Sequence, residues 1–191
     1  NPLIIHCYQQ KQLEDLVTEI PKKAQALMDK FWPGPLTLVL PKTSLVPSIV
    51  SAGLDTVGIR IPDHALALEL LKRAQFPLAA PSANRSGRPS PTRMEHVLAD
   101  LGGKIPAVID GGETGWGLES TVLDCTALPF RLLRPGGITL EELAEVAPIQ
   151  EKDRSETANY AVVKPVGSVY AGVLQIEPFF HFPLNFFSLY A

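Results

Sequence analysis

Several features that would assign this chain to a common protein class are missing or scarce in its 191 residues. Cys7 and Cys125 are the only cysteines, too few for a disulfide framework or a cysteine zinc site. We interpret both as small buried thiols in a reducing compartment. No apolar run reaches the roughly 18 to 20 residues that a membrane-spanning helix needs. A net charge of −3 argues against a general attraction to nucleic acid or to anionic membranes.

The common phosphate-binding and catalytic signatures are absent as well. The chain contains neither the P-loop pattern GxxxxGKS or GxxxxGKT nor the dinucleotide fingerprint GxGxxG. No Ser-His-Asp order, zinc-ligand spacing or carboxylate pair stands out. A bound phosphate would therefore have to be held by some other arrangement.

The composition is ordinary for a globular protein, with 46% hydrophobic and 19% charged residues. The length is sufficient for one domain with its own core, which we place at residues 1–147. Residues 150–160 are charged and polar, as is typical of a linker, and phenylalanines crowd residues 179–187. We describe residues 148–191 as a linker and an aromatic tail, and assign them no role.

Short apolar runs alternate with segments of helical periodicity along the first 147 residues. Strands are expected at 3–6, 36–40, 56–61, 77–80, 107–110, 120–124 and 131–134. Helices are expected at 12–20, from Pro21 to Phe31, at 63–73, at 92–101 and after Thr139. This alternation predicts an α/β fold with an open sheet that is at least partly parallel.

Three of the expected helices begin with residues that favour a helix N-terminus. Asp63 is a plausible N-cap for the helix at 63–73. Thr92 with Glu95, and Thr139 with Glu142, each have the spacing of a capping box, in which side chain and backbone bond reciprocally.

The loop PSANRSGRPSPT, at 81–92, is the strongest candidate for a binding site. It follows an apolar strand and precedes a capped helix, so it leaves the carboxyl end of a strand, where open α/β sheets bind ligands. Hydroxyls, an amide, arginines and a glycine are suited to a phosphate-bearing ligand. These residues are Ser82, Ser86, Ser90, Asn84, Arg85, Arg88 and Gly87. The alternative is a solvated turn region without a ligand, and composition does not decide between the two.

Charged and polar residues at strand ends are the second signal. Arg60 interrupts the apolar run at 56–61, and such a charge costs several kcal/mol of desolvation, roughly, unless it is paired. It either holds a carboxylate or phosphate, or belongs to a structural ion pair or an exposed edge. Arg134, before Pro135-Gly136-Gly137, invites the same two interpretations. His6, which ends the first strand, is more often a core or rim histidine than a site residue.

Together these segments resemble the YrdC-like family, the threonylcarbamoyl-AMP synthases. The matching pieces occur in family order over residues 1–147, and the ordered set is far more specific than any one piece. They are NPLIIH at 1–6, FWPGPLTLVL at 31–40, TVGIRIPDH at 56–64, APSANRSGRPSPT at 80–92, ESTVLD at 119–124 and LLRPGGIT at 132–139. The resemblance implies a twisted α/β sheet with a large, positively lined concave cavity.

The resemblance also implies an activity and its partners. The family converts L-threonine, bicarbonate and ATP, with Mg²⁺ shielding the triphosphate, to threonylcarbamoyl-adenylate and pyrophosphate. The product serves the machinery that transfers threonylcarbamoyl to adenosine in tRNA, and contact with tRNA or another RNA would be consistent with it. We therefore expect a nucleotidyltransferase that is not bound to a membrane and lies in the cytoplasm, or alternatively in an organelle.

Particular residues of this chain fall on family contact positions. The threonine-contacting set implied by the resemblance is His6, Arg60, Ala80 and Ser120. The ATP-contacting set is Thr56, Ser82, Asn84, Ser90 and Arg134, with Asn84 as a neighbour of the others. Arg60 would pair with the threonine carboxylate. No residue stands out as a nucleophile and none is required, because positioning and charge neutralisation supply most of the acceleration in such transfers.

One departure from the family pattern and two rival functions complete the sequence-based expectations. The chain opens on Asn1 rather than Met, without the strand, threonine-rich turn and basic motif that precede NPL in the family. We therefore expect an N-terminally incomplete enzyme that binds ATP weakly and turns over little. The first rival function is a non-catalytic RNA-binding module. The second is a domain that handles carbamoyl-adenylate, as in hydrogenase maturation.

Overall fold

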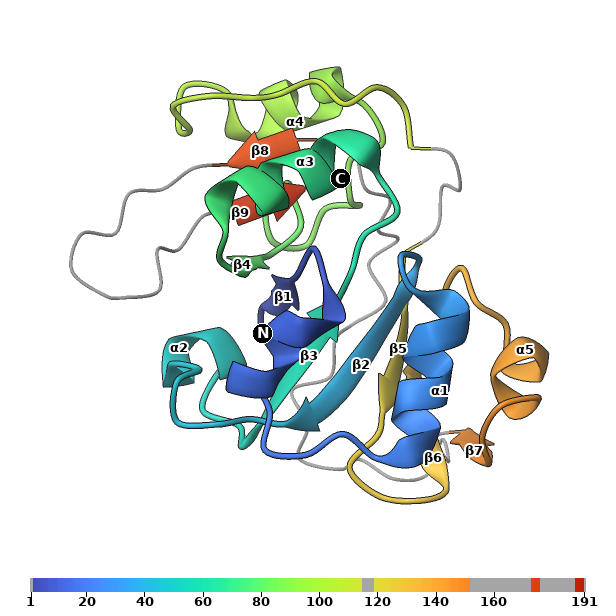
Figure 1. Cartoon of the computed structure of the whole chain (residues 1–191). Helices are drawn as coiled ribbons and strands as arrows, with labels where there is room; N and C mark the ends of the chain where they lie inside the picture. The colour runs from blue at the N-terminus through green and yellow to red at the C-terminus, as the bar shows by residue number, and fades with distance from the viewer. Residues whose placement is uncertain (1, 115–118, 152–172, 176–187, 191) are drawn as a thin grey trace.

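The fold is built on a mixed sheet of seven strands in the order β4-β1-β3-β2-β5-β6-β7 (Figure 1). The computed structural model describes residues 2–114, 119–151, 173–175 and 188–190. The strands are β1 (Ile4–His6), β2 (Leu36–Pro41), β3 (Thr56–Arg60), β4 (Leu78–Ala80), β5 (Thr121–Asp124), β6 (Phe130–Arg134) and β7 (Ile149–Glu151). β1–β3, β2–β5 and β6–β7 pair in parallel, and the other neighbours are antiparallel. The predicted open, mixed α/β sheet is confirmed.

Helices lie over the sheet at β2, at its β4 edge and at the opposite edge beside β7 (Figure 1). They are η1 (Gln10–Asp15), α1 (Lys22–Phe31), α2 (Ser48–Ser51), α3 (Ala65–Ala74), α4 (Met94–Leu101) and α5 (Leu140–Ala144). The helix predicted at 12–20 is a 3-10 helix that ends at Asp15. The reason is that Val17 forms a β-bridge with Lys42, and Thr18 N–H donates to the Pro41 carbonyl, so the chain is already extended there.

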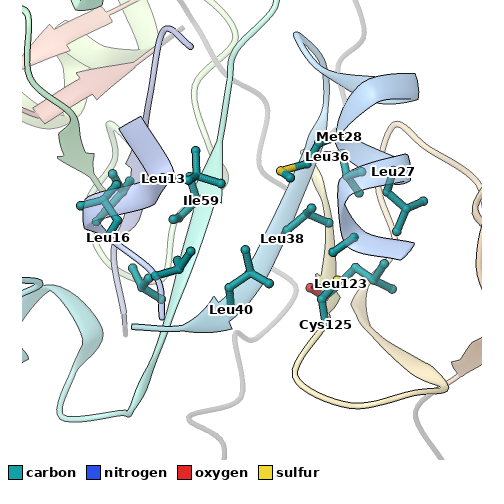
Figure 2. Close-up of a cluster of buried hydrophobic side chains, with 14 of the residues drawn as sticks. Leu13, Leu16, Leu27, Met28, Leu36, Leu38, Leu40, Ile59, Leu123 and Cys125 are labelled. Carbon is teal, nitrogen blue, oxygen red and sulfur yellow. Dashed lines mark hydrogen bonds between the residues drawn. The ribbon is translucent and has the colours of Figure 1, made fainter. Parts of the chain in front are cut away.

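One face of the sheet is apolar and forms the core. Side chains on a strand alternate between faces, so Leu36, Leu38 and Leu40 of β2 point the same way as Ile59 of β3 and Leu123 of β5. Figure 2 shows these side chains packed against leucines and a methionine from η1, from its C-cap residue and from α1, namely Leu13, Leu16, Leu27 and Met28. All of these residues are at most 2% exposed. Burial of this layer fixes the register of β2 and β3.

The opposite face of the same strands carries polar and charged side chains among apolar ones, and we call it the polar face. Thr56 and Arg60 alternate with Val57 and Ile59 along β3 and therefore lie on the other side of the sheet from the leucine layer. Their register neighbours share that side; they are His6 and Ile4 of β1, Ala80 of β4, Thr37 and Val39 of β2, Val122 of β5 and Arg134 of β6. The alternation of side chains along the strands thus places the core-forming leucines on one face and the candidate site residues on the other.

The strand predicted at 107–110 is wrong, because this segment forms no strand in the structure. Asp110 Oδ1 accepts from Gly112 N–H (2.9 Å), which makes a local turn, and the Gly111 carbonyl lies 3.2 Å from Nε2 of His64. The segment is therefore attached through turn and loop contacts rather than through a β-ladder.

The helix starts were predicted with mixed success. The Thr139 capping box is confirmed, with Glu142 N–H donating to the Thr139 hydroxyl and the Glu142 carboxylate accepting from Thr139 N–H. The N-cap of α3 is His64 rather than Asp63, because Nδ1 of His64 accepts from Ala67 N–H (3.3 Å). The Thr92 capping box is wrong.

α4 starts one residue later than that capping box required. Its N-cap is Arg93, which makes no side-chain cap bond. The Thr92 hydroxyl instead lies 3.2 Å from Nδ1 of His96. The first backbone N–H groups of α4 therefore lack the side-chain cap that Thr139 provides at α5.

Among the described residues beyond 147, only β7 joins the sheet. β7 lies beyond residue 147, so the sheet extends past the end of the domain expected from sequence. β8 (Val173–Gln175) and β9 (Ser188–Tyr190) form a separate antiparallel pair. Of the linker expected at 150–160, the first two residues belong to β7 and the rest lie outside the described residues, as does the phenylalanine-rich stretch at 179–187. Among the described helices, none has the length and apolarity needed to cross a membrane.

Candidate active site

His6 and Arg60 lie side by side at the carboxyl ends of two parallel strands. They are register partners in the β1–β3 ladder, and are 4% and 7% exposed. Nε of Arg60 donates to the Gly34 carbonyl at 3.0 Å, which fixes the base of the guanidinium. Gly34 in turn follows α1, and its N–H donates to the Ile61 carbonyl (2.9 Å). The end of β3 and the loop before β2 therefore fix the orientation of the Arg60 side chain.

His6 is neutral at physiological pH. Burial, and secondly the charge of Arg60, lower its pKa from 6.5 to about 3, and contacts to the backbone of Ile4 and Leu78 oppose this only in part. Nδ1 of His6 is buried without a hydrogen-bond partner among the described residues. Buried polar atoms are rarely left unpaired, so this nitrogen is a candidate contact for a ligand.

Ser120 connects the neighbouring strand ends. It is fully buried, and its hydroxyl lies 2.8 Å from that of Thr37, which follows Leu36 on β2 and is opposite Arg60 in the antiparallel register. Arg134 grips the same serine, because Nε and Nη2 donate to the Ser120 carbonyl (3.1 and 2.9 Å) and Nη2 donates to its hydroxyl (3.0 Å). Arg60, Ser120 and Arg134 thus belong to one end of the polar face.

Glu119 is the residue of this cluster that sequence analysis missed. Its Oε2 lies 2.7 Å from Nη1 of Arg134, and the two side chains are 14% and 11% exposed. Burial raises the pKa of Glu119, against the smaller opposing effects of Arg134 and of a hydrogen bond from Ser90. The available signal was the β5–β6 hairpin, which places the residues before Thr121 against those that follow Arg134.

The backbone of this cluster depends on Gly136. A Cβ at this position would lie 2.3 Å from the Glu119 carbonyl oxygen and 2.5 Å from the Ser120 carbonyl carbon. The next residue, Gly137, donates its N–H to the Glu119 carbonyl at 3.0 Å. Only glycine permits this approach, so the Pro-Gly-Gly turn sets the position of Glu119 and Ser120.

The loop at 81–92 is held mainly by its own residues and by α4. Nδ2 of Asn84 donates to the carbonyls of Arg85 and Arg88 (3.0 and 2.8 Å). Asp100 of α4 accepts from Arg85 N–H (3.2 Å) and from Nη1 of Arg88 (2.6 Å), and its carbonyl accepts from Nε of Arg85 (3.1 Å). Both loop arginines are therefore engaged with Asp100, which the phosphate-loop interpretation did not anticipate.

The serines of this loop differ in their surroundings. Ser82 and Ser86 are exposed, whereas Ser90 is 7% exposed and reaches the Glu119 carboxylate. The end of the loop thus joins the cluster around Arg134. Asn84 is used as an internal tie of the loop, and one oxygen of its side chain, Oδ1, is buried without a partner among the described residues.

Thr56 and Ala80 lie farther along the same face. Thr56 begins β3, four residues before Arg60, which corresponds to roughly 13 Å at about 3.3 Å per residue. Ala80 pairs with Ile4, whereas His6 pairs with Leu78, because β4 runs antiparallel to β1. The structure therefore gathers His6, Arg60, Ser90, Ser120 and Arg134 at one end, and places Thr56 and Ala80 farther along the face.

The family model Sua5_yciO_yrdC, described as telomere recombination, matches residues 1–136, more than half of the chain. The chain belongs to the Sua5–YciO–YrdC family.

Threonylcarbamoyl-AMP synthase of Pyrococcus abyssi is 57% identical over 146 residues, which are 76% of this chain and 43% of that protein. The enzyme of the same name from Bacillus subtilis is 52% identical over 167 residues, 86% and 48% of the two chains. A crystal structure of P. abyssi Sua5 complexed with L-threonine matches with a TM-score of 0.76 at 55% identity, over 78% of this chain and 45% of that one. The chain thus spans somewhat less than half the length of these relatives.

Proposed function

We propose that this chain carries the threonine- and ATP-binding part of a threonylcarbamoyl-AMP synthase. The observation that carries the proposal is the cluster at one end of the polar face, where buried Arg60 and His6 lie beside the Ser120–Arg134 pair. Membership of the family, and relatives above 50% identity that bear the synthase name, support it.

Threonine binds in this proposal at the ends of β1 and β3. The guanidinium of Arg60 pairs with the threonine carboxylate, because its planar fork suits two oxygens and burial strengthens the pair. Nδ1 of neutral His6 and the hydroxyl of Ser120 supply polar contacts to the rest of the amino acid. The complex of P. abyssi Sua5 with L-threonine supports this choice of substrate.

ATP binds alongside, with its phosphates toward Arg134 and Ser90. The rest of the nucleotide extends along the polar face toward Thr56 and Ser82. An amino acid is too short to reach from Arg60 to these residues. Mg²⁺ enters as part of the MgATP substrate, since it prefers phosphate oxygens and water to a dedicated protein cage. Among the described residues, no group of three or more His, Cys, Asp or Glu is arranged to hold a metal.

The chemistry is an in-line displacement at phosphorus. The amine nitrogen of threonine bonds to the carbon of bicarbonate, a water molecule leaves, and an oxygen of the resulting carbamate attacks the α-phosphorus of ATP. A carbamate–phosphorus bond forms, the bond from the α-phosphorus to the bridging oxygen breaks, and that oxygen leaves with pyrophosphate. Arg134 offsets charge on the phosphates and Arg60 orients the nucleophile, so positioning and electrostatics do the catalytic work. The adenylate then serves tRNA modification, in the cytoplasm or an organelle.

Threonine binding tests this proposal directly. Calorimetry on the 191-residue chain compares the unaltered protein with Arg60→Lys, Ser120→Ala and the control Arg131→Lys. Arg60→Lys keeps the charge but loses the fork, and we expect affinity to fall by about tenfold or more, near 1.4 kcal/mol. Arg131 lies on the polar face beside Asp124 (3.5 Å), outside the predicted site, so its variant is expected to bind normally.

Equal affinity of the Arg60 and Arg131 variants for threonine would remove Arg60 from the site. AMP formation that depends on carbamoyl phosphate rather than threonine would favour the carbamoyl-adenylate alternative. Salt-sensitive RNA binding without nucleotide binding would favour the RNA-binding alternative.

A further inference from the structure

Glu119 stands between two groups that the family resemblance assigns to ATP. Its carboxylate is 2.7 Å from Nη1 of Arg134 and also accepts a hydrogen bond from the Ser90 side chain. Ser90 comes from the end of the loop at 81–92 and Arg134 from the end of β6, so no other described acid connects these two elements. One carboxylate thus engages both side chains that the resemblance assigns to ATP.

Arg134 does not need Glu119 to keep its orientation. Nε and Nη2 of Arg134 already make bonds of 3.1, 2.9 and 3.0 Å to the carbonyl and hydroxyl of Ser120. Ser120 itself is fixed by Thr37 at 2.8 Å and by the close approach of Gly136 to its backbone. Ser120 accepts hydrogen bonds from Nε and Nη2 but none from Nη1. Glu119 places a negatively charged carboxylate beside Nη1.

That charge is held at a cost. Burial is the largest influence on Glu119 and raises its pKa, so the pair with Arg134 does not fully offset the loss of water. A polyphosphate offers Arg134 and Ser90 several charged oxygens instead of one carboxylate, and arginine pairs with phosphate in the same charge-assisted, bidentate way as with a carboxylate. A triphosphate is therefore chemically able to displace the carboxylate.

We propose that Glu119 is an internal competitor of the nucleotide, which holds Arg134 and Ser90 while the site is empty and gives way to a phosphate of ATP. The inference rests on the proposed function, because it takes ATP as the ligand. It adds that nucleotide affinity is set below its maximum by a carboxylate of the chain itself, so that ligands with few phosphate oxygens are bound poorly.

The test is ATP binding by calorimetry, with and without Mg²⁺, to the unaltered chain, E119Q, E119D and D124N. E119Q keeps the shape of the side chain and removes its charge, and we expect about tenfold tighter binding in both conditions, or 1.4 kcal/mol. E119D keeps the charge but shortens its reach, so its affinity is expected to fall between the two. D124N is the matched control, because Asp124 also pairs with an arginine of the polar face, Arg131, and its affinity is expected to be unchanged.

Each other outcome is decisive. If E119Q binds ATP as well as or less well than the unaltered chain, the inference is overturned and the proposed function stands. A loss that occurs only with Mg²⁺ would assign Glu119 to the metal complex and equally overturn it. If none of the four proteins binds ATP, the proposed function fails and takes the inference with it. Should E119Q not fold, an E119D affinity at or below that of the unaltered chain overturns the inference on its own.

Discussion

His6 links the candidate site to the stability of the fold. Its folded-state pKa of about 3 lies below the ordinary 6.5, so below pH 6.5 the unfolded chain takes up a proton that the folded chain refuses. The contribution is complete above pH 6.5 and is lost progressively as the pH falls toward 3. At pH 5 we expect a loss of about 2 kcal/mol in the free energy of unfolding relative to pH 7.5.

Urea unfolding at pH 7.5 and pH 5 measures this effect when the unaltered chain is compared with His6→Asn, which cannot titrate in this range. The difference between the two pH dependences isolates His6 from the other groups. Identical pH dependence in both proteins would show that His6 is not buried in its neutral form.

Asp100 is the residue that ties the loop at 81–92 to α4. Its side chain is 8% exposed and accepts from Arg85 N–H and from Nη1 of Arg88. We expect Asp100→Ala to lower the free energy of unfolding by about 1 to 3 kcal/mol, because the charge-assisted hydrogen bonds from the Arg85 backbone and from Arg88 to a buried carboxylate are lost. Hydrogen exchange of the Arg85 amide should also accelerate.

The matched control for Asp100 is Glu69→Ala. Glu69 pairs with Arg73 at 2.7 Å, but both side chains are exposed, and such pairs are worth about 0.5 kcal/mol or less. Equal effects of the two substitutions would mean that Asp100 does not anchor the loop.

The sequence identifies individual residues of the candidate site more reliably than it identifies their hydrogen-bond partners. Arg60 and His6 are recognisable because a strand pattern ends on them, and the structure places them together. The arginines of the loop give no such signal, since their partner Asp100 lies on a later helix. Glu119 escapes notice because only the hairpin turn brings it to Arg134. The assignment of each residue to threonine or ATP stays a prediction.

The two expected capping boxes offer a matched test at the scale of helices. Only the Thr139 box forms, so Thr139→Ala is expected to lower the free energy of unfolding by about 1 kcal/mol. Thr92→Ala should cost about 0.5 kcal/mol or less, because Thr92 caps no helix and its hydroxyl contacts only His96. Chemical denaturation of both variants provides the measurement, and a larger loss for Thr92→Ala would contradict the observed helix start.

Strands were predictable where burial demanded apolar side chains. β2, β3 and β5 each carry a run that faces the leucine layer, and the expected bounds are within a residue of those observed. The segment at 107–110 has a similar run but finds no strand to pair with, and its residues are largely exposed. β7 was missed for the opposite reason, because an edge strand reading Ile-Gln-Glu has no apolar pattern to reveal it.

The molecule as a whole depends on the leucine layer in Figure 2. Leu38 lies at the centre of the sheet and is fully buried, so Leu38→Ala is expected to cost about 2 to 5 kcal/mol through lost burial and the remaining cavity. Ile49, at 77% exposure, is the control, and Ile49→Ala should change stability by about 0.5 kcal/mol or less. Thermal and urea unfolding test both, and a small loss for Leu38→Ala would mean that the core lies elsewhere.

The two-sided sheet has a consequence for how such a protein can change over evolutionary time. In β3, Ile59 and Arg60 are adjacent in the chain yet serve opposite layers. A single inserted or deleted residue within this strand would turn the arginine into the hydrophobic core and the isoleucine onto the polar face. Insertions and deletions are therefore tolerated in the loops rather than in β3. Within the strand, evolution is limited to substitutions that keep each side chain on its present face of the sheet.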